Sequence, residues 1–241
     1  MNNKPRKNGF SLTEVLLAVG TLAVGMSLVA GLYPAGILFT MHATERSIAA
    51  AVADEAFAKI KLAAISPASL STNQHELLPG VLSRPLAVTE YFYPSEPGVA
   101  PQQKKYCWQA ICRRAGERAV QVTVFVCRRV GSGRIYRNSL NPFDRNGALA
   151  VPSPVPVSVS AAGGTVITID DPQSEAFIGD GSTIVDDETG LMYRVHDRDG
   201  AEIYLNRSWQ GALSGAVWVV PPPFGGGRNP CVAVYQRVVM F

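Results

Sequence analysis

A run of thirty residues without Asp, Glu, Lys or Arg, from Val15 to Thr44, constrains this 241-residue chain more than any other feature. A helix needs only about 20 apolar residues to cross the hydrocarbon core of a bilayer. The run follows a short leader whose basic residues are Lys4, Arg6 and Lys7. Because basic flanks of membrane helices stay in the cytoplasm, the sequence predicts a single-pass membrane protein with a cytoplasmic amino terminus and an exported remainder.

Glu14 stands directly before this run. A carboxylate in an apolar helix costs about 2.5 to 3.5 kcal/mol at the centre of a membrane, and less near the interface. A membrane anchor alone therefore does not favour an acidic residue here. A buried carboxylate is tolerated when it is paired with a positive charge, so Glu14 requires a partner.

The residues around Glu14 resemble a processing signal. The hexapeptide Gly-Phe-Ser-Leu-Thr-Glu at residues 9–14, followed by Val-Leu-Leu-Ala-Val-Gly, resembles the class III signal of type IV pilins and of type II secretion pseudopilins. In that family a membrane-embedded aspartyl peptidase, the prepilin peptidase, cuts after the glycine and methylates the new amino terminus. The resemblance implies a cut between Gly9 and Phe10, N-methylation of Phe10, and a Glu14 carboxylate that neutralises the terminal ammonium of a neighbouring subunit during assembly.

An ordinary signal anchor that happens to contain these residues is the alternative. A cleaved secretory signal fits less well, because the apolar run is too long and no small-residue cleavage site follows it. The leader is therefore assigned to residues 1–9 and the pilin-type helix to residues 10–65, with its membrane part at 15–41.

The helix is expected to continue from the membrane into the exported head. Residues 43–65 lack Pro and Gly, and an apolar residue recurs every four positions, which predicts a stripe that faces the sheet of the head. The stripe consists of Ile48, Val52, Ala56 and Ile60. Pro67 ends the helix.

Pro34 lies inside the membrane part, between Gly31 and Gly36. Proline removes a backbone donor, so the sequence predicts a kink or local melting of the helix there. Similar stretches of type IV pilins unwind on assembly, and the resemblance implies the same for this chain.

The clearest β-structure is a hairpin, with strands at 106–112 and 120–127 and a turn near 115–118. Valine occupies alternate positions from 120 to 126, a period of two that is typical of a half-buried strand. The Tyr-x-Trp first strand and the valine-rich return strand resemble the soluble head of the minor pseudopilins of the I type and of PilV-like minor pilins. The likeness to the family covers residues 1 to about 130 and implies a pilin-like β head over 66–137, in which six prolines make 66–104 an irregular crossover with one or two short strands.

Residues 138–160 are rich in Pro, Asn and Ser and predict an extended linker. Beyond it, residues 161–241 form a distal β-rich domain or insertion, with short strands separated by turns that contain Gly. The expected strands are Thr165–Ile169, Thr183–Val185, Leu191–His196, Glu202–Leu205, Ala216–Val220 and Cys231–Met240. This pattern is typical of a small barrel or sandwich, and the alternative is an insertion that returns its last strand to the head sheet.

Four cysteines, Cys107, Cys112, Cys127 and Cys231, lie on the exported side, where disulfides persist in an oxidising compartment. Folding the hairpin about residue 117 places Cys107 opposite Cys127. We therefore expect at least one disulfide, with this pair slightly preferred and Cys112 and Cys231 left over. Directly opposed positions are often poor disulfide geometry, and free buried thiols are the alternative. Zinc is disfavoured, because the sequence has no C-x-x-C and no histidine at ligand spacing from a cysteine.

Charge and motifs argue against several other functions. Without the leader, 19 basic residues balance 19 acidic ones, so the mature chain is formally neutral and offers no global electrostatic reason to bind nucleic acid. The acidic residues at 170–171, 180 and 186–188 match no EF-hand spacing, and solvated turn caps are the simpler reading of them. His42, His75 and His196 are isolated from any recognisable nucleophile. We expect no catalytic residue, no cofactor and no metal.

The sequence therefore predicts an α+β protein, in which a long amino-terminal transmembrane and amphipathic helix packs on an antiparallel β-sheet head with a distal β-rich, barrel-like region. The expected function is that of a minor pilin or pseudopilin subunit of a type II secretion or type IV pilus-like machine. Its expected partners are the membrane, the prepilin peptidase and other pilin or pseudopilin subunits. The precursor is expected in the inner membrane with a periplasmic head, and in a filament after assembly. The alternative is a surface adhesin or DNA-uptake pilin whose distal β region binds a ligand.

Overall fold

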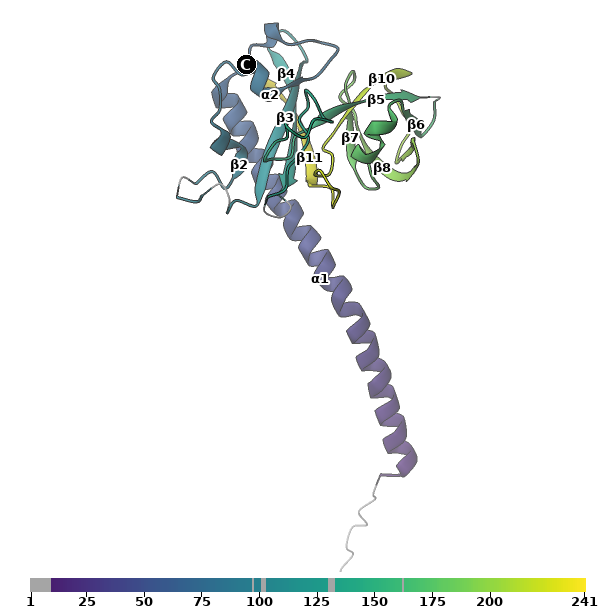
Figure 1. Ribbon diagram of the computed structural model, residues 1–241. Helices are drawn as coiled ribbons and strands as arrows, with labels where there is room; N and C mark the ends of the chain where they lie inside the picture. The colour runs from purple at the N-terminus through teal and green to yellow at the C-terminus, as the bar shows by residue number, and fades with distance from the viewer. Residues whose placement is uncertain (1–9, 97, 101–102, 130–132, 162) are drawn as a thin grey trace, which may run out of the picture. The chain divides into compact units, whose positions relative to one another are not determined.

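A 52-residue helix, α1 (Leu12–Ala63), is the longest element of the protein (Figure 1). The computed structural model describes residues 10–96, 98–100, 103–129, 133–161 and 163–241. The chain divides into two units, Met1–Glu45 and Arg46–Phe241, and α1 contributes to both.

Within the first unit, α1 is apolar around its whole circumference. Its large apolar side chains, from Leu12 to Met41, are exposed along the helix. The helix is long and apolar enough to cross a membrane. A helix surface of this kind is unfavourable in water.

The expected interruption at Pro34 is not present in the single chain. The structure keeps α1 helical through this residue. A proline inside a helix removes one backbone hydrogen bond, and the turns on either side of Pro34 hold the helix together across that loss. The prediction of local melting at this position is therefore wrong for the single chain.

The second unit contains an antiparallel sheet whose strands are ordered β1-β3-β4-β11, with β2 also paired to β3. The hairpin predicted from the sequence is confirmed as β3 and β4, which pair from Tyr106↔Arg128 to Arg114↔Val120. The strands are β1 (Glu76–Leu77), β2 (Phe92–Tyr93), β3 (Tyr106–Arg114), β4 (Ala119–Arg128) and β11 (Cys231–Met240). Three short helical segments complete this part: η1 (Pro67–Ser69), α2 (Leu78–Val81) and η2 (Val88–Tyr91).

The second part of α1 packs on one face of this sheet. The predicted stripe is confirmed, since Val52, Ala56 and Ile60 are fully buried and Ile48 is partly buried against the same core. On β4 the alternate valines from 120 to 126 face this helix, because successive strand residues point to opposite faces. The helix ends at Ala63, close to the predicted boundary.

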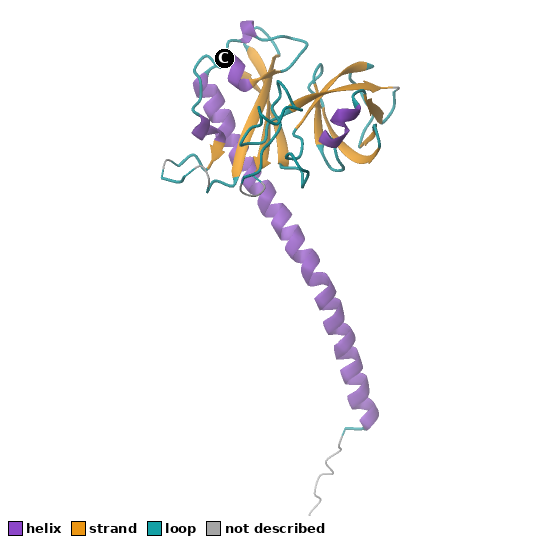
Figure 2. Ribbon diagram, in the orientation of Figure 1, coloured by secondary structure: helices purple, strands orange, loops and turns teal. Residues whose placement is uncertain are grey.

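The remaining strands close into a six-stranded antiparallel barrel, in the order β10-β5-β6-β9-β8-β7 (Figure 2). They are β5 (Val155–Ala161), β6 (Val166–Ile169), β7 (Thr183–Asp186), β8 (Met192–Asp199), β9 (Glu202–Leu205) and β10 (Ser214–Val219), with η3 (Pro172–Phe177) between β6 and β7. The barrel has a core of its own, which is rich in Val and Ile. The distal strands predicted from the sequence are present within a few residues of their expected bounds.

Strand β5 corrects the predicted linker, because it begins inside residues 138–160. Its buried and exposed residues alternate: Val155 and Val157 point into the barrel, and Pro156 points outward. Of the three prolines that suggested a linker, Pro156 thus occupies the outer side of the strand, while Pro152 and Pro154 are buried just before it. After β10 the chain returns to the sheet as β11, which pairs with β4, so the barrel is an insertion between two neighbouring strands.

The barrel packs on the face of the sheet opposite to α1. Val185 of β7 and Trp218 of β10 share one apolar cluster with Ile111, Phe125 and Cys127 of the sheet. The sheet therefore buries both of its faces, one under the helix and one under the barrel.

Candidate functional site

The start of α1 carries the residues expected for processing and assembly. Phe10 precedes the helix and is 86% exposed. The backbone N–H of Ser11 donates to Glu14 Oε2, and the N–H of Glu14 donates to Ser11 Oγ, each at 3.3 Å. This reciprocal pair is a capping box, and the negative charge also suits the positive end of the helix dipole. In the single chain Glu14 therefore caps its own helix. Gly9, the expected cleavage residue, lies outside the described residues.

Three of the four cysteines meet on the barrel side of the sheet. Cys127 of β4 pairs with Cys107 of β3 on one side and with Cys231 of β11 on the other. All four cysteines are free thiols in the structure. Cys112 lies on the opposite face, in the core beneath α1, so the expected remaining pair of Cys112 and Cys231 is not brought together.

Burial sets the chemistry of these thiols. It raises the pKa of Cys107 to about 12, although nearby Arg129 lowers that pKa in part. Burial also raises the pKa of Cys127 well above its ordinary value, and the contact between its thiol and Cys231 raises it further. Since the thiolate is the reactive form, these groups are unreactive while the fold is closed.

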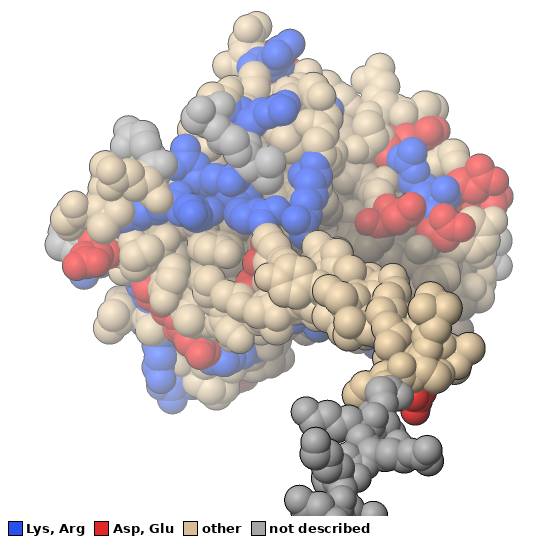
Figure 3. All heavy atoms as spheres, turned by 90° about the horizontal axis from the view of Figure 1, so that it is seen from below, with Lys and Arg blue, Asp and Glu red and all other residues tan. Residues whose placement is uncertain are grey.

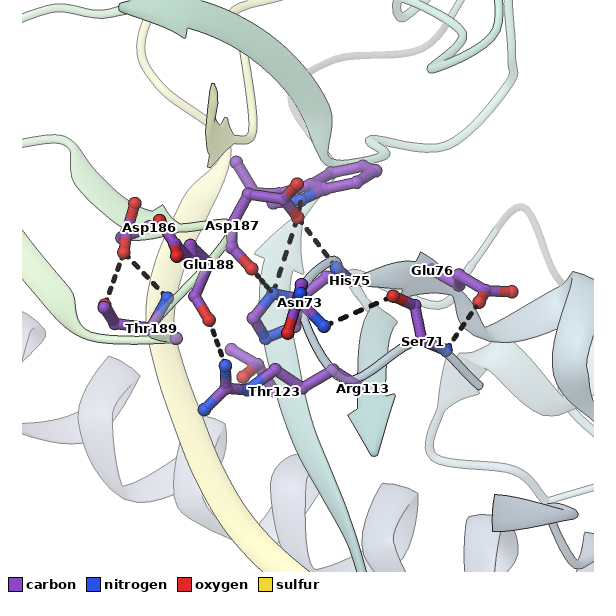
Figure 4. Close-up of polar contacts among 12 residues, drawn as sticks. Ser71, Asn73, His75, Glu76, Arg113, Thr123, Asp186, Asp187, Glu188 and Thr189 are labelled. Atoms are coloured by element: carbon purple, nitrogen blue, oxygen red, sulfur yellow. Dashed lines mark hydrogen bonds and ion pairs between the residues drawn. The ribbon is translucent and has the colours of Figure 1, made fainter. Parts of the chain in front are cut away.

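A cluster of polar contacts, which includes the buried His75 and Asp186, lies at the junction between barrel and sheet (Figure 4). It is built by the turn after β7, residues 186–190, which we call the junction turn. Asp187 Oδ1 accepts the backbone N–H of His75 at 2.8 Å and the Trp218 indole N–H at 2.6 Å. The His75 ring donates from Nδ1 to the Asp187 carbonyl at 2.7 Å. Asp187 thus joins the loop before β1 to barrel strand β10.

The Asp187 carboxylate is ionised, although its partial burial disfavours the charged form. Burial by itself raises the pKa of Asp187, but the hydrogen bonds from His75 and Trp218 outweigh it and hold the pKa below its ordinary value. His75 is almost fully buried beside it.

Two further contacts anchor the rest of the junction turn. Arg113 of β3 donates to the carbonyl of Glu188 and, through Nε, to the Gln121 side chain at 2.6 Å. Gln236 of β11 donates to the carbonyl of Gly190 at 2.8 Å. The backbone of the turn therefore reaches two strands of the sheet, β3 and β11.

Three of the six acidic residues at 170–171, 180 and 186–188 have structural roles, and Asp187 is one of them. Asp171 caps η3 through the N–H of Gln173 at 3.0 Å. Asp186 accepts the N–H of Thr189 at 2.8 Å and closes the junction turn. Among the described residues, no group of three His, Cys, Asp or Glu is placed to hold a metal ion.

The sequence did not identify the junction. His75 and Asp187 are separated by 112 positions, and nothing local in the sequence relates them. The other two histidines, His42 in α1 and His196 in β8, are exposed and remote from such a cluster. Trp108 and Trp218 are buried, and Trp209 is partly buried.

A groove of about 820 Å³ lies in the head beside this junction. It is lined by the segments 76–92 and 138–156 and by Trp218, and its most exposed apolar residues are Val88 and Leu140. Apolar concavities of this size are typical of surfaces that contact a ligand or a protein.

No protein-family model, curated protein or solved structure matches this chain.

Proposed function

We propose that this protein is a minor pilin or pseudopilin subunit, which is inserted in the inner membrane, cleaved and N-methylated by the prepilin peptidase, and then assembled through α1 into a periplasmic filament. The observation that carries the proposal is the combination of Glu14 and an apolar helix whose side chains are exposed in the single chain. An acidic residue at such a position is unfavourable unless assembly gives it a positive partner.

The geometry at the start of α1 suggests how Glu14 changes partner. Before assembly its carboxylate accepts the N–H of Ser11. Cleavage before Phe10 creates an ammonium group, and in a bundle of such helices the ammonium of a neighbouring subunit is the charge that compensates Glu14. The carboxylate then exchanges a neutral backbone donor for a charged one, and charge-assisted hydrogen bonds are roughly twice as strong as neutral ones.

The decisive experiment is Glu14→Gln. Glutamine keeps a side-chain oxygen that accepts from Ser11, so the helix cap survives, but the charge is lost. A neighbour's ammonium is then unpaired among apolar helices, at a cost of about 3 to 5 kcal/mol. Membrane insertion and peptidase cleavage should persist, while recovery of the processed protein with its partner subunits should fall by two orders of magnitude or more.

Glu45→Gln is the matched control, because it removes one negative charge from the same helix beyond the uncharged run. Co-purification of processed subunits measures both variants. If Glu14→Gln is recovered at the level of the unmodified chain, Glu14 has no role in assembly and the proposal fails.

The alternative of a DNA-uptake pilin receives little support from the barrel. Residues 155–219 contain 3 Lys and Arg against 10 Asp and Glu, which is unfavourable for contact with phosphates. A proteinaceous cargo or neighbouring subunit fits that surface better.

A further inference from the structure

The sheet of the Arg46–Phe241 unit has one long strand at its edge. β11 pairs with β4 on one side, and among the described residues no strand pairs with its other side. Every residue of β11 is at least partly exposed, whereas most residues of β3 and β4 are buried. The outer edge of β11 therefore lies at the surface.

The ladder with β4 determines which backbone groups of β11 point outward. The N–H of Phe241 donates to the carbonyl of Arg118 at 2.8 Å, so the odd-numbered residues from Ala233 onward exchange hydrogen bonds with β4. The carbonyl of Ala119, opposite Met240, agrees with this parity, because it accepts the N–H of Ala115 on the far side of β4. The even-numbered residues then direct their N–H and C=O groups away from β4. They are Val234, Gln236, Val238 and Met240.

Other edges in the described part of the chain are protected. The barrel strands close on themselves, and the opposite edge of the sheet carries β1 and β2, which have only two residues each. Natural proteins protect open edges with short strands, prolines, bulges or charges, because unpaired N–H and C=O groups attract another strand. From Ala233 to Met240, β11 has no proline, and its register shifts only at its start.

Charge does not protect this edge either. Residues 46–154 and 220–241 contain 16 Lys and Arg and 7 Asp and Glu, a net charge of +9, and the barrel, residues 155–219, carries −7. Charged side chains are accordingly frequent on the face shown in Figure 3. β11 contributes only Arg237, whose guanidinium pairs with Asp54 at 2.7 Å. The edge therefore lacks the charged residues that would keep a second strand away.

The side chains near the end of β11 specify one face of an added strand. Val234 belongs to the apolar cluster beneath the barrel, so the even-numbered residues of β11 face the barrel side. On that side Val238 is 60% exposed and Met240 is 64% exposed. A strand added at this edge would cover both side chains if its own residues on the same face were apolar.

We propose that the outer edge of β11, from Val234 to Met240, binds an extended segment of a different protein chain by β-strand addition. In this binding mode, backbone hydrogen bonds give affinity and alternate side chains give specificity. The segment has an apolar residue at every second position, and these residues lie against Val238 and Met240. The inference goes beyond the proposed function, because it rests only on the Arg46–Phe241 unit.

A second copy of this chain is a poor occupant of the edge. In an antiparallel pair of β11 strands, the even-numbered residues of both copies would exchange hydrogen bonds, and directly opposed residues share one face of a sheet. Both barrels would therefore lie on the same face of the joined sheet, each with a net charge of −7. Repulsion between them opposes such a pair.

Hydrogen exchange of the full-length chain in nanodiscs, at one copy per disc, tests whether the edge is open. We expect the even-numbered backbone amides from 234 to 240 to exchange fast and the odd-numbered ones to exchange slowly, as resolved residue by residue by mass spectrometry. Equal protection of the two sets overturns the inference, since the edge is then covered. Protection of the even-numbered amides in discs with two copies also overturns it, because the occupant is then a second copy.

The binding probe is the acetylated, fluorescently labelled peptide Thr-Val-Thr-Val-Thr-Val-Thr, made in two isomers. One isomer is N-methylated at its three Val amides and the other at its last three Thr amides, so each can pair through one edge only. Valines that lie against Val238 and Met240 direct their own amides toward β11. The Thr-methylated isomer should therefore bind, as measured by fluorescence anisotropy, and protect the even-numbered amides. The Val-methylated isomer should bind about a hundredfold less tightly, because it loses three hydrogen bonds of about fivefold each.

Val238→Pro removes one outward N–H and leaves the hydrogen bonds to β4 in place, because proline is tolerated where the N–H of an edge strand faces solvent. It should weaken binding of the Thr-methylated isomer by about fivefold or more. The matched control Val238→Thr keeps the N–H and should retain most of the binding. Equal affinity of the two variants overturns the inference, and so does equal binding of the two isomers. The comparison of isomers uses the unmodified chain, so it decides the question even where Val238→Pro does not fold.

Discussion

The sheet and the barrel lie in one unit of the chain, but they differ in charge and in how they are held. The sheet is basic and is covered by α1 along a long apolar stripe. The barrel is acidic, has a separate core, and is attached through the apolar cluster around Trp218 and the polar contacts of the junction turn. Because the barrel is an insertion with its own core, we expect that changes which weaken its contact with the sheet leave the barrel itself folded.

Both ends of the barrel insertion lie at the cysteine cluster. The chain leaves the sheet after Cys127 at the end of β4 and returns at Cys231 at the start of β11. A bond between these two residues would clamp the insertion at its base. The Cys127 thiol contacts the Cys231 side chain, whereas the Cys107 thiol points at the Cys127 carbonyl at 3.8 Å. The geometry therefore favours Cys231 over Cys107, the partner preferred from the sequence.

The largest expected effect is that of this clamp. Because the buried thiols are unreactive in the closed fold, the chain is refolded with glutathione disulfide, which accepts the two electrons and leaves as two thiols, and this oxidation should join Cys127 to Cys231. Closing a loop of about 100 residues should raise the free energy of unfolding by about 4 to 5 kcal/mol. Peptide mapping and denaturant unfolding measure the two results. Cys127→Ser should abolish the gain, while Cys112→Ser, on the other face, should leave the bond intact.

The second largest effect is expected for the hydrogen bonds of Asp187, which attach the barrel to the sheet. Asp187→Ala leaves the backbone N–H of His75 and the Trp218 indole N–H without their acceptor, and each unsatisfied buried donor costs about 1 to 3 kcal/mol. We expect a loss of about 3 kcal/mol and separate unfolding transitions for barrel and sheet. Asp170→Ala, at an exposed barrel position, is the control. A single transition at unchanged stability would show that the apolar cluster alone holds the barrel.

Gly190→Ala should act through shape. Gly190 has φ +70°, and an added Cβ would lie 2.6 Å from Gln121 Nε2, so the junction turn or that side chain must move. We expect a loss of about 2 kcal/mol. Gly200→Ala separates strain from contact, because Gly200 also has a positive φ but faces open space. Equal losses in both variants, measured by denaturant unfolding, would mean that the close approach to Gln121 is unimportant.

The features that the sequence predicted well are those that depend on local patterns. The β3–β4 hairpin joins two strands that are close in the sequence, and the alternate valines of β4 indicate which face of the strand is buried. The stripe on α1 repeats with the helical period, so its contact with a sheet was predictable. The start of α1 was interpreted through a local motif, although Gly9 lies outside the described residues.

The rest depends on contacts that no local pattern encodes. Strand β5 was missed because Pro156 and the two prolines just before the strand resemble a linker, and only its pairing with β10 and β6 makes it a strand. The junction joins His75, Asp187 and Trp218 across more than a hundred positions. The opposite charges of barrel and sheet were also hidden, since the total for the mature chain is zero.

The smallest expected effect is the acid sensitivity of the junction. Hydrogen bonds from His75 and Trp218 hold the pKa of Asp187 below its ordinary value in the folded protein. A group whose pKa is depressed by folding contributes stability above its unfolded pKa, about 3.9 for Asp, and loses that contribution as the pH falls through the folded value. Trp218 fluorescence should therefore report loosening of the barrel only below about pH 4. Asp187→Asn retains an oxygen acceptor for Trp218 but does not titrate, so its fluorescence should lack this acid step. If the step persists in Asp187→Asn, it arises from another carboxylate, and the barrel is not held by the charge of Asp187.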